Sequence, residues 1–424
     1  MKKKQDPTSL SADKLKKRYF FILGREAHLA VAELIVMLGK MNLSYNILAN
    51  GREVLIVEAL ELPKELFAEL GGMIKYGECL FEEPGIENLK TETFISNILG
   101  EKMIFGFSVY ALGEMPLGVL KSIKSKLDRF AMVLKKEIKQ TISRVRYVTT
   151  NDLALSSVAV LTNKLMREGG HEFVALVEGG NIIFGKTLAV QDFSEFRHRD
   201  FGRPVRDPKR GTLPPKLARI LLNLAGASKD TTILDPFCGD GTVFTEAIAL
   251  GYKKLIGSDI DPLAVTNTEA NTEWCKASYN QNTEVRLFAA DARHLADMLP
   301  PQSVGAIVAE GDLGSPLRVR LTKLEAERAI ESISVLYRET IKVLASLLER
   351  GGRMVLALPH YPTEAGEFGI SFAGLSFDEL HLVPVDVWPK EVKKNIGRFG
   401  AHSSYIYGRE DQKVERQIFI FQKM

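Results

Sequence analysis

A glycine-rich turn at residues 231–242 (TTILDPFCGDGT) contains the residues best suited to bind a ligand. It follows a buried-strand pattern that ends at Asp235, and Gly239 and Gly241 precede a helix pattern that begins near Val243. Glycine lets the backbone approach a ligand closely, and a helix N-terminus favours a negative group such as a carboxylate. The acidic strand end suits an amine. The turn therefore predicts a site for the charged end of an amino acid, and its lack of the GxGxxG pattern disfavours a nicotinamide cofactor.

Two further acids follow the next two strand patterns. Asp259 closes the pattern KLIGSD, and Asp291 comes directly after EVRLFAA. A carboxylate at the second strand end can bind the vicinal hydroxyls of a ribose, and one at the third can accept a hydrogen bond from the amine of adenine. A single acid at such a place often only caps a helix. Three acids at successive strand ends, beside one glycine-rich turn, favour a ligand site.

The elements that must position these acids form an alternating series from Pro214 onward. Strand patterns are separated by helix patterns of about 10–15 residues, which is typical of a parallel, doubly wound α/β sheet of the Rossmann type. Such a sheet binds ligands at the carboxyl ends of its strands, where the three acids lie. The last apolar runs, at 403–409 and 416–423, predict an antiparallel hairpin at the sheet edge.

The first half of the chain predicts a separate α+β region. Strand and helix patterns alternate over residues 18–90, and residues 100–190 repeat the mixture with a long helix at 119–140 and a hairpin around Gly179. A chain of 424 residues is too long for one ordinary core, so two or three domains are expected. The basic, polar residues 1–17 predict a disordered tail.

Composition excludes several classes of protein. Three scattered cysteines give neither a disulfide framework nor the spacing of a zinc site, which predicts no metal and fits a reducing cytoplasm. The apolar run near the start is too short for a signal peptide or a membrane span, so no membrane partner is expected. The formal charge of +3 says little about partners, which leaves the decision to local clusters.

Two segments are strongly basic. Residues 118–170 hold 11 Lys and Arg against 4 Asp and Glu, and residues 197–216 hold 7 against 2. A charged helix face is often merely solvated, but two such segments in a nearly neutral chain favour a polyanionic partner. The second segment is rich in Pro and Gly and predicts an ordered linker rather than a helix.

Several of these motifs resemble one family. DPFCGDGT, IGSDIDP and AADAR look like motifs I, II and III of class I S-adenosylmethionine-dependent methyltransferases. Residues 197–225 are similar to the segment that enters the catalytic domain of THUMP-domain tRNA guanine N2-methyltransferases, and residues 403–421 resemble their closing hairpin. The resemblance covers nearly the whole chain, with its weakest part before residue 100. It implies a disordered tail (1–17), a ferredoxin-like domain (18–98), a THUMP domain (99–192), a linker (193–212) and a methyltransferase domain (213–424).

The resemblance also implies roles for individual residues. The cofactor would be S-adenosyl-L-methionine, with its methionine end at Asp235, Gly239 and Gly241, its ribose at Asp259 and its adenine at Asp291. The same predicted cofactor site includes Phe237, Asp240, Ile260, Ala292 and Pro214. THUMP domains grip the acceptor end of tRNA, which makes tRNA the expected partner. The candidate RNA-binding residues are Lys121, Lys124, Arg144, Arg146, Arg197 and Arg199. Some members of the family also use an accessory subunit.

One loop departs from the family pattern. Amino methyltransferases of this type carry Asp/Asn-Pro-Pro-Tyr/Phe after the fourth strand, where a carboxylate or amide orients the amine and the ring stacks on the base. Residues 308–314 read VAEGDLG, without the prolines and the ring. Glu310 and Asp312 are the candidate catalytic residues, and two acids so close could make a proton acceptor.

Three functions remain open from the sequence. The first is methyl transfer to the exocyclic N2 of a guanosine in tRNA. The second is a catalytically impaired tRNA-binding homologue that keeps the cofactor fold, which the loop at 308–314 favours. The third is methylation of an amino group in DNA, which shares the chemistry of that loop.

Overall fold

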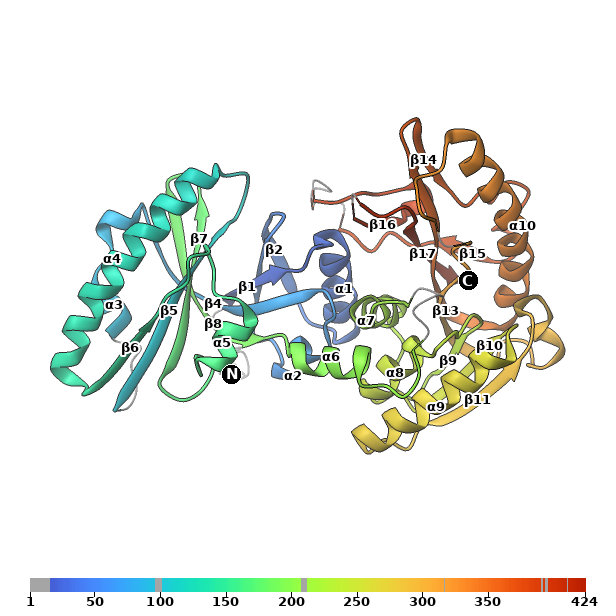
Figure 1. Cartoon of the computed structure of the whole chain (residues 1–424), viewed down its shortest axis with the longest axis horizontal. Helices are drawn as coiled ribbons and strands as arrows, with labels where there is room; N and C mark the ends of the chain where they lie inside the picture. Colours follow the sequence, from blue (N-terminus) through green and yellow to red (C-terminus); the bar gives the residue numbers. More distant parts are fainter. Residues whose placement is uncertain are drawn as a thin grey trace, which may run out of the picture.

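Two β-sheets, one in each half of the chain, organise the molecule (Figure 1). The computed structural model describes residues 16–95, 101–206, 212–315, 317–389, 392, 396–409 and 411–424. Most of the tail predicted at 1–17 lies outside these residues, and Lys17 already begins the first strand. None of the described helices is long and apolar enough to cross a membrane.

The N-terminal sheet has the strand order β2-β3-β1-β4-β8-β7-β5-β6. Its strands are β1 (Lys17–Leu23), β2 (Tyr45–Asn50), β3 (Val54–Ala59), β4 (Met73–Glu83), β5 (Lys102–Ala111), β6 (Arg144–Val148), β7 (Gly170–Glu178) and β8 (Asn181–Val190). The helices of this half are α1 (Ala27–Lys40), α2 (Lys64–Glu69), α3 (Thr91–Ile95), α4 (Leu117–Thr141) and α5 (Ser157–Thr162), with a short 3-10 turn at Ile86–Asn88.

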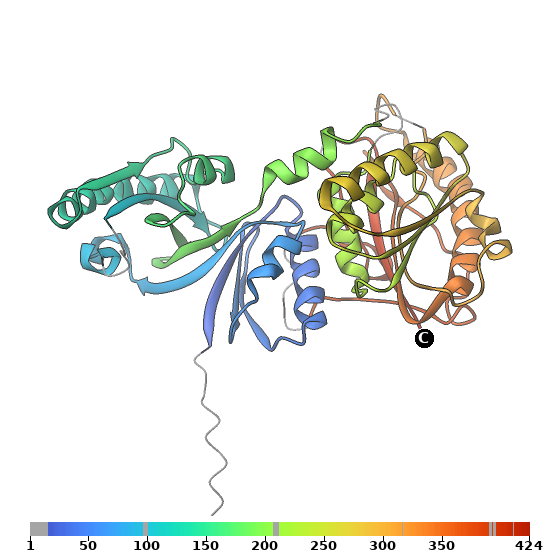
Figure 2. The ribbon, with the colours of Figure 1, turned by 90° about the horizontal axis from the view of Figure 1, so that it is seen from below.

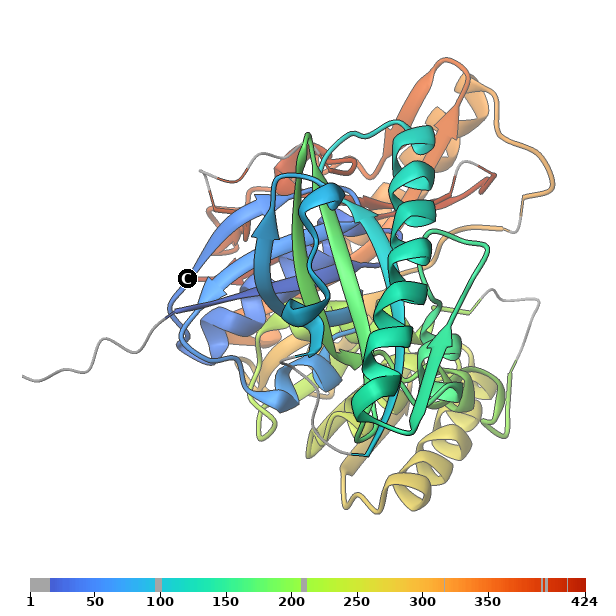
Figure 3. The same ribbon diagram turned by 90° about the vertical axis from the view of Figure 1, so that its left-hand side faces the viewer.

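Strand β4 joins the two regions expected at 18–98 and 99–192. It pairs antiparallel with β1 along its first part and with β8 along nearly its whole length, so strands from both ranges form one continuous sheet. Residues 96–100, where the boundary was expected, lie outside the described residues. The long helix α4 packs its apolar face on β5 and β6. It lies in front in Figure 3, which looks onto this end of the molecule.

The C-terminal sheet has the order β11-β10-β9-β12-β13-β17-β15, with β14 paired to β13 and β16 to β17. Its strands are β9 (Thr232–Asp235), β10 (Lys254–Asp259), β11 (Glu284–Ala289), β12 (Val304–Glu310), β13 (Leu348–Thr363), β14 (Gly366–Gly369), β15 (Leu382–Pro384), β16 (Tyr405–Tyr407) and β17 (Glu415–Lys423). The helices around it are α6 (Phe193–Phe201), α7 (Pro215–Ala225), α8 (Thr242–Ala249), α9 (Pro262–Tyr279) and α10 (Lys323–Leu347), with 3-10 turns at Ala292–Asp297 and Ala401–Ser403.

The predicted doubly wound sheet is confirmed. Strands β9 to β13 run parallel, and β9 lies between β10 and β12, so the connections diverge from this point. The predicted closing hairpin is formed by β16 and β17. Strand β17 also pairs antiparallel with β13, so the edge of the sheet lies beyond β17 and not at it.

The linker prediction was wrong for part of its segment. Residues 193–201 form helix α6, because Asp192 caps it by accepting hydrogen bonds from the N–H groups of Ser194 and Glu195. The Pro- and Gly-containing residues after it are not helical up to residue 206, and residues 207–211 lie outside the described part. Figure 2 shows α6 bridging the N-terminal sheet and the C-terminal domain.

Helix α1 fills the junction between the two halves. It is buried on nearly every side, because it packs on the N-terminal sheet and also against α7 of the C-terminal domain (Figure 1). One apolar cluster therefore runs from β1 and α1 through α7 to the buried face of β9 and β12. This shared core fixes the position of the N-terminal sheet relative to the ligand-binding edge of the C-terminal sheet.

Candidate cofactor and substrate site

A cavity of about 660 Å³ lies at the carboxyl ends of β9, β10 and β12, where the strand order reverses. Such a switch point is where open α/β sheets bind ligands. Its lining includes six carboxylates: Asp235, Asp240, Asp259, Asp291, Glu310 and Asp312. The lining contains one arginine, Arg293, which is bound to Asp291 at 2.7 Å and to Glu339 at 3.1 Å. This acidic cavity favours a positively charged ligand.

The strand ends of β9 and β10 are linked through the glycine-rich turn. The carboxylate of Asp259 accepts hydrogen bonds from the N–H groups of Gly239 and Asp261, both at 3.0 Å. Asp235 is 2 % exposed and accepts a hydrogen bond from the N–H of Phe237 at 3.1 Å. The two acids are therefore held in fixed positions at the cavity floor.

The turn needs glycine for two reasons. Gly239 and Gly241 have φ angles of 52° and 76°, in the left-handed region, and α8 begins directly after them. A Cβ on Gly241 would also lie 3.0 Å from the Cγ2 of Thr268. The hydroxyl of Thr268 donates a hydrogen bond to the carbonyl of Gly239 at 2.8 Å, which ties the turn to α9.

Burial raises the pKa of Asp235 well above its ordinary value, and the nearby charges of Asp259 and Glu310 add to this. A cationic group bound in the cavity would reverse this effect, since it favours the ionised carboxylate. At Asp291, hydrogen bonding to Arg293 lowers the pKa of the carboxyl group. The acids of one cavity therefore differ in how readily they ionise.

The loop at 310–314 holds its two acids in different ways. The Nε of Arg416, on β17, donates a hydrogen bond to the Oε1 of Glu310. Asp312 accepts a hydrogen bond from the N–H of Gly314 at 2.9 Å, within its own turn. Each acid of the loop thus has its own donor, and their action as a joint proton acceptor stays a prediction. Glu310 remains at the end of β12 and lines the cavity.

Two tyrosines fix the backbone of this loop. The hydroxyl of Tyr337, on α10, donates to the carbonyl of Asp312 at 2.6 Å, and the hydroxyl of Tyr361, on β13, donates to that of Leu313 at 2.9 Å. A Cβ on Gly311 would lie 2.3 Å from the Tyr337 hydroxyl, and one on Gly314 would lie 2.7 Å from that of Tyr361. Glycine at these two positions therefore leaves room for the tyrosine hydroxyls. The two hydrogen bonds restrain the loop backbone, as prolines would in the family pattern. Tyr361 follows the core of its strand and could be expected near this cavity from the sequence, whereas no sequence pattern indicated Tyr337.

Comparison with known families identifies the C-terminal region. Residues 203–365 match UPF0020, the RMKL-like methyltransferase domain. Over these residues the chain is similar to the methyltransferase domain of that family.

Individual relatives match the same region. The tRNA (guanine(10)-N2)-dimethyltransferase of Methanothermobacter thermautotrophicus is 34% identical over 180 residues, which are 42% of this chain and 48% of the relative. The tRNA (guanine(6)-N2)-methyltransferase of Thermus thermophilus is 33% identical over 161 residues, which are 36% of this chain and 43% of the relative. The chain thus spans about half the length of the curated relatives it matches.

A solved structure matches the architecture of the whole chain. TrmN from Thermus thermophilus aligns with a TM-score of 0.53 at 14% identity and covers 96% of this chain and 100% of its own. At this identity the match shows the fold alone. It confirms the fold class, in which a mixed α/β region precedes a Rossmann-type sheet.

The structure places most of the predicted cofactor residues in the acidic cavity of the methyltransferase domain. Those that line it are Asp235, Phe237, Gly239, Asp240, Asp259, Ile260, Asp291 and Ala292. Gly241 shapes the turn without being part of the lining. Pro214, which was also predicted for this site, lines a neighbouring cavity instead. The two residues before it, Thr212 and Leu213, line the acidic cavity.

Two of the candidate RNA-binding residues are also corrected. Lys124 has a side chain that is 7% exposed, and its ammonium lies 2.5 Å from the carboxylate of Asp128. Arg199 is 2% exposed and donates to Glu246 at 2.5 Å. Both cations serve internal ion pairs and do not face solvent. The exposed candidates are Lys121, Arg144, Arg146 and Arg197.

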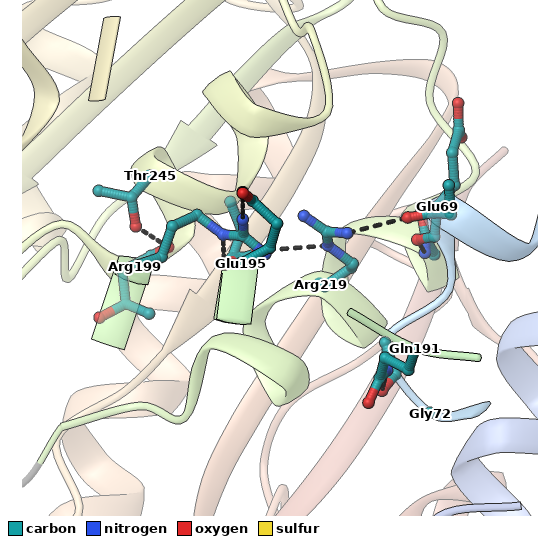
Figure 4. Close-up of polar contacts among 12 residues, drawn as sticks. Glu69, Gly72, Gln191, Glu195, Arg199, Arg219 and Thr245 are labelled. Atoms are coloured by element: carbon teal, nitrogen blue, oxygen red, sulfur yellow. Dashed lines mark hydrogen bonds and ion pairs between the residues drawn. The ribbon is translucent and has the colours of Figure 1, made fainter. Parts of the chain in front are cut away.

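Arg199 instead belongs to a network at the domain junction (Figure 4). The buried carboxylate of Glu246 accepts hydrogen bonds from Arg199 and from Arg219, the latter at 2.8 Å. Arg219 also donates to the carbonyl of Ala68 at 3.0 Å, which connects α7 to the N-terminal region. Helices α6, α7 and α8 are thereby held together around one buried charge. Arg199 of the basic segment 197–216 thus has a structural role.

A second buried acid lies on the N-terminal side of the junction. The carboxylate of Glu33 accepts hydrogen bonds from the N–H groups of Gly71 and Gly72, both at 2.8 Å, and from the amide of Asn223 at 2.7 Å. Burial raises the pKa of Glu33 to about 7. The residue connects α1, the turn before β4, and α7.

Proposed function

We propose that this protein transfers a methyl group from S-adenosyl-L-methionine to the exocyclic N2 of a guanosine in tRNA. The N2–C bond forms as the S–CH₃ bond breaks, N2 releases a proton, and S-adenosylhomocysteine is the second product. The observation that carries the proposal is the acidic cavity at the switch point of a UPF0020 methyltransferase domain. The names of the relatives that match this domain support the choice of tRNA guanine N2.

The residues of the cavity fit this cofactor. When bound, S-adenosylmethionine supplies an electrophilic methyl group on a sulfonium. Its two cationic groups suit a lining with six carboxylates, and a volume of about 660 Å³ is ample for a nucleoside-sized ligand. In this proposal Asp235 holds the amine, Asp259 the ribose hydroxyls and Asp291 the adenine amine. The N-terminus of α8 faces the carboxylate.

The loop at 310–314 would orient the substrate. The lone pair of the guanine N2 is delocalised into the ring, so the nitrogen needs acceptors that align it with the methyl group. Glu310 lines the cavity and can accept one N2 hydrogen, while Arg416 holds its carboxylate in place. Tyr337 and Tyr361 keep the loop backbone in one conformation. The base must leave its helical stack to reach this site.

The exposed basic residues of the N-terminal half support tRNA as the partner. Lys121 on α4 and Arg144 and Arg146 on β6 are exposed. Helix α4 and strand β6 lie at the end of the molecule farthest from the methyltransferase domain (Figure 1). Phosphate contacts at this distance would position the tRNA without reading its sequence. We also propose a cytoplasmic location, which the free thiols of Cys79, Cys238 and Cys275 support.

The proposal is tested with unmodified tRNA transcripts and S-adenosylmethionine that carries a labelled methyl group, followed by mass spectrometry of the digested RNA. We expect N2-methylguanosine. Glu310→Gln should lower kcat at least about tenfold with little change in cofactor affinity, because only an orienting acceptor is lost. The matched control is Glu327→Gln on the exposed face of α10.

Other outcomes would contradict the proposal. If the protein binds the cofactor and tRNA but transfers no methyl group, it is a tRNA-binding homologue that has lost its chemistry. If the label enters an amino group of DNA instead, the substrate assignment is wrong. Equal loss of kcat in Glu310→Gln and Glu327→Gln would remove Glu310 from the mechanism.

A further inference from the structure

A second cavity, of about 450 Å³, lies where the N-terminal sheet meets the methyltransferase domain. Its walls come from the turn between β1 and α1, the glycine turn before β4, helix α6, the start of α7 and the segment after β16. The buried network of Figure 4 lies beside it, since Gly72 and Gln191 belong to both. Parts of the chain far apart in sequence thus form one concave surface.

Four cationic side chains surround this second cavity: Arg25, Arg197, Lys216 and Arg409. All four are exposed, and no carboxylate of the described residues lies within ion-pair distance of any of them. Arginines that serve the fold here, such as Arg199 and Arg219, are buried and paired. The three arginines of the rim are therefore available to an external anion, and the ammonium of Lys216 lies 5.4 Å from the centre of the Phe196 ring in the same cavity.

The two carboxylates of the lining offset these four positive charges only in part, and Arg25 is the cation that acts most strongly on Glu26. Asp200 lies 3.8 Å from Arg206. Glu26 accepts a hydrogen bond from the N–H of Gly408, and its carboxylate lies 3.9 Å from the ring of His28. Burial raises the pKa of Glu26 to about 7, which reduces its negative charge near neutral pH. The second cavity therefore carries a net positive charge.

The backbone adds to this charge. Helix α7 has 11 residues and begins at this cavity, with Pro214 as its N-cap residue. The N–H groups of Lys216 and Leu217 have no acceptor within the helix, because the first helical bond runs from the N–H of Ala218 to the carbonyl of Pro214. A helix N-terminus with free N–H groups favours an anion. Phe193, Phe196 and Tyr407 give the same cavity an aromatic wall.

The second cavity, called the basic cavity from here on, adjoins the acidic cavity at two consecutive residues. Leu213 lines the acidic cavity and Pro214 lines the basic one. From this we infer that the basic cavity binds successive backbone phosphates of the RNA substrate, close to the nucleotide that enters the acidic cavity. The inference rests on the proposed function for the identity of the RNA. The arginines and the helix N-terminus would bind the phosphates, and Phe193 and Tyr407 of the aromatic wall would contact a ribose or base.

The test is the affinity for an unmodified tRNA transcript, measured at several salt concentrations. The double variant Arg197→Gln/Arg409→Gln should weaken binding about tenfold at 0.1 M salt. The slope of log affinity against log salt should become shallower by about 1.4–1.8, since each lost phosphate contact contributes about 0.7–0.9. The matched control, Arg52→Gln/Arg350→Gln, makes the same change of charge at exposed sites outside the cavity and should keep the wild-type slope.

The remaining measurements separate this inference from the proposed function. Calorimetry with S-adenosylmethionine should give the same affinity for both double variants and the wild type. An equal loss of tRNA binding in the control, or no loss in either, would overturn the inference. So would tight binding of inorganic phosphate, measured alone, that Arg197→Gln/Arg409→Gln abolishes while tRNA affinity stays unchanged, because the ligand would then be a free phosphate. Absence of methyl transfer would overturn only the proposed function.

Discussion

The two cavities on either side of Leu213 and Pro214 differ in charge and also in construction. In the acidic cavity, carboxylates are held by backbone N–H groups or by an arginine before any ligand binds, as at Asp259 and Asp291. In the basic cavity, the charges are on exposed side chains without carboxylate partners among the described residues. Fixed groups suit a small ligand of one shape. Long cationic side chains without carboxylate partners suit a polyanion whose backbone conformation varies.

Substitution of Asp259 should weaken ligand binding in the acidic cavity and leave binding at the basic cavity unchanged. Asp259→Ala removes the carboxylate that accepts two backbone hydrogen bonds and that we propose to bind the ribose hydroxyls. We expect S-adenosylmethionine affinity to fall at least about a hundredfold, since hydrogen bonds to a charged group are worth about 1.5–3 kcal/mol each. Calorimetry measures this, with Asp297→Ala at an exposed site as control. A parallel loss of tRNA affinity would contradict the division of roles.

In the unaltered protein, the salt concentration should affect ligand affinity at the basic cavity much more than at the acidic cavity. Four phosphate contacts at the basic cavity would lower tRNA affinity at least about fiftyfold between 50 and 200 mM salt. Affinity for S-adenosylmethionine should change by less than about twofold, because its contacts involve few released counterions. Titrations of both ligands over this range test the contrast. Parallel salt dependence for the two ligands would show that charge does not divide them in this way.

Gly311 tests how tightly the wall of the acidic cavity is fixed. Gly311→Ala places a Cβ 2.3 Å from the Tyr337 hydroxyl, so the tyrosine or the loop must move. We expect a loss of about 2–3 kcal/mol in the free energy of unfolding, as for other overpacked sites. Denaturant unfolding measures it. Gly113→Ala is the control, because an added Cβ there meets no atom within 4 Å, and an equal loss at both positions would refute the explanation.

Glu33 tests the junction that forms one wall of the basic cavity. Its pKa of about 7 in the folded protein exceeds the ordinary 4.5, so its contribution to stability is full below pH 4.5 and declines as pH rises to 7. Between pH 5 and 7.5 the free energy of unfolding of the wild type should fall by about 2 kcal/mol relative to that of Glu33→Gln. Unfolding curves at each pH measure this difference. The exposed Glu331→Gln should follow the wild type, and a constant difference for Glu33→Gln would contradict the raised pKa.

The acidic cavity was largely predictable because its residues follow local rules. A strand end, a glycine turn and a helix start are adjacent in sequence, so Asp235 and Gly239 could be placed from pattern alone. The residues that complete the cavity come from elsewhere. Tyr337 and Tyr361 lie 25 and 48 residues from the carbonyls they bind, and Arg416 lies 106 residues from Glu310. No local pattern indicates such contacts.

The basic cavity could not be predicted in the same way. Charge counting found the segment 197–216 but could not tell Arg197, which is exposed, from Arg199, which is buried. The difference depends on Glu246, which is 47 residues away on another helix. Likewise, the repeated mixture of strands and helices indicated two N-terminal units, but no pattern showed that β4 would pair with a strand more than 90 residues later.

That shared strand limits how the protein can be divided. A shortened chain that ends near residue 95 would keep β4 but lose β8, and the backbone N–H and C=O groups of β4 that face β8 would have no partners. An unpaired strand edge of this kind promotes association between molecules. A fragment that starts at β5 would expose the matching edge of β8. The N-terminal half should therefore be expressed, evolve and unfold as a single unit, although its sequence pattern predicts two domains.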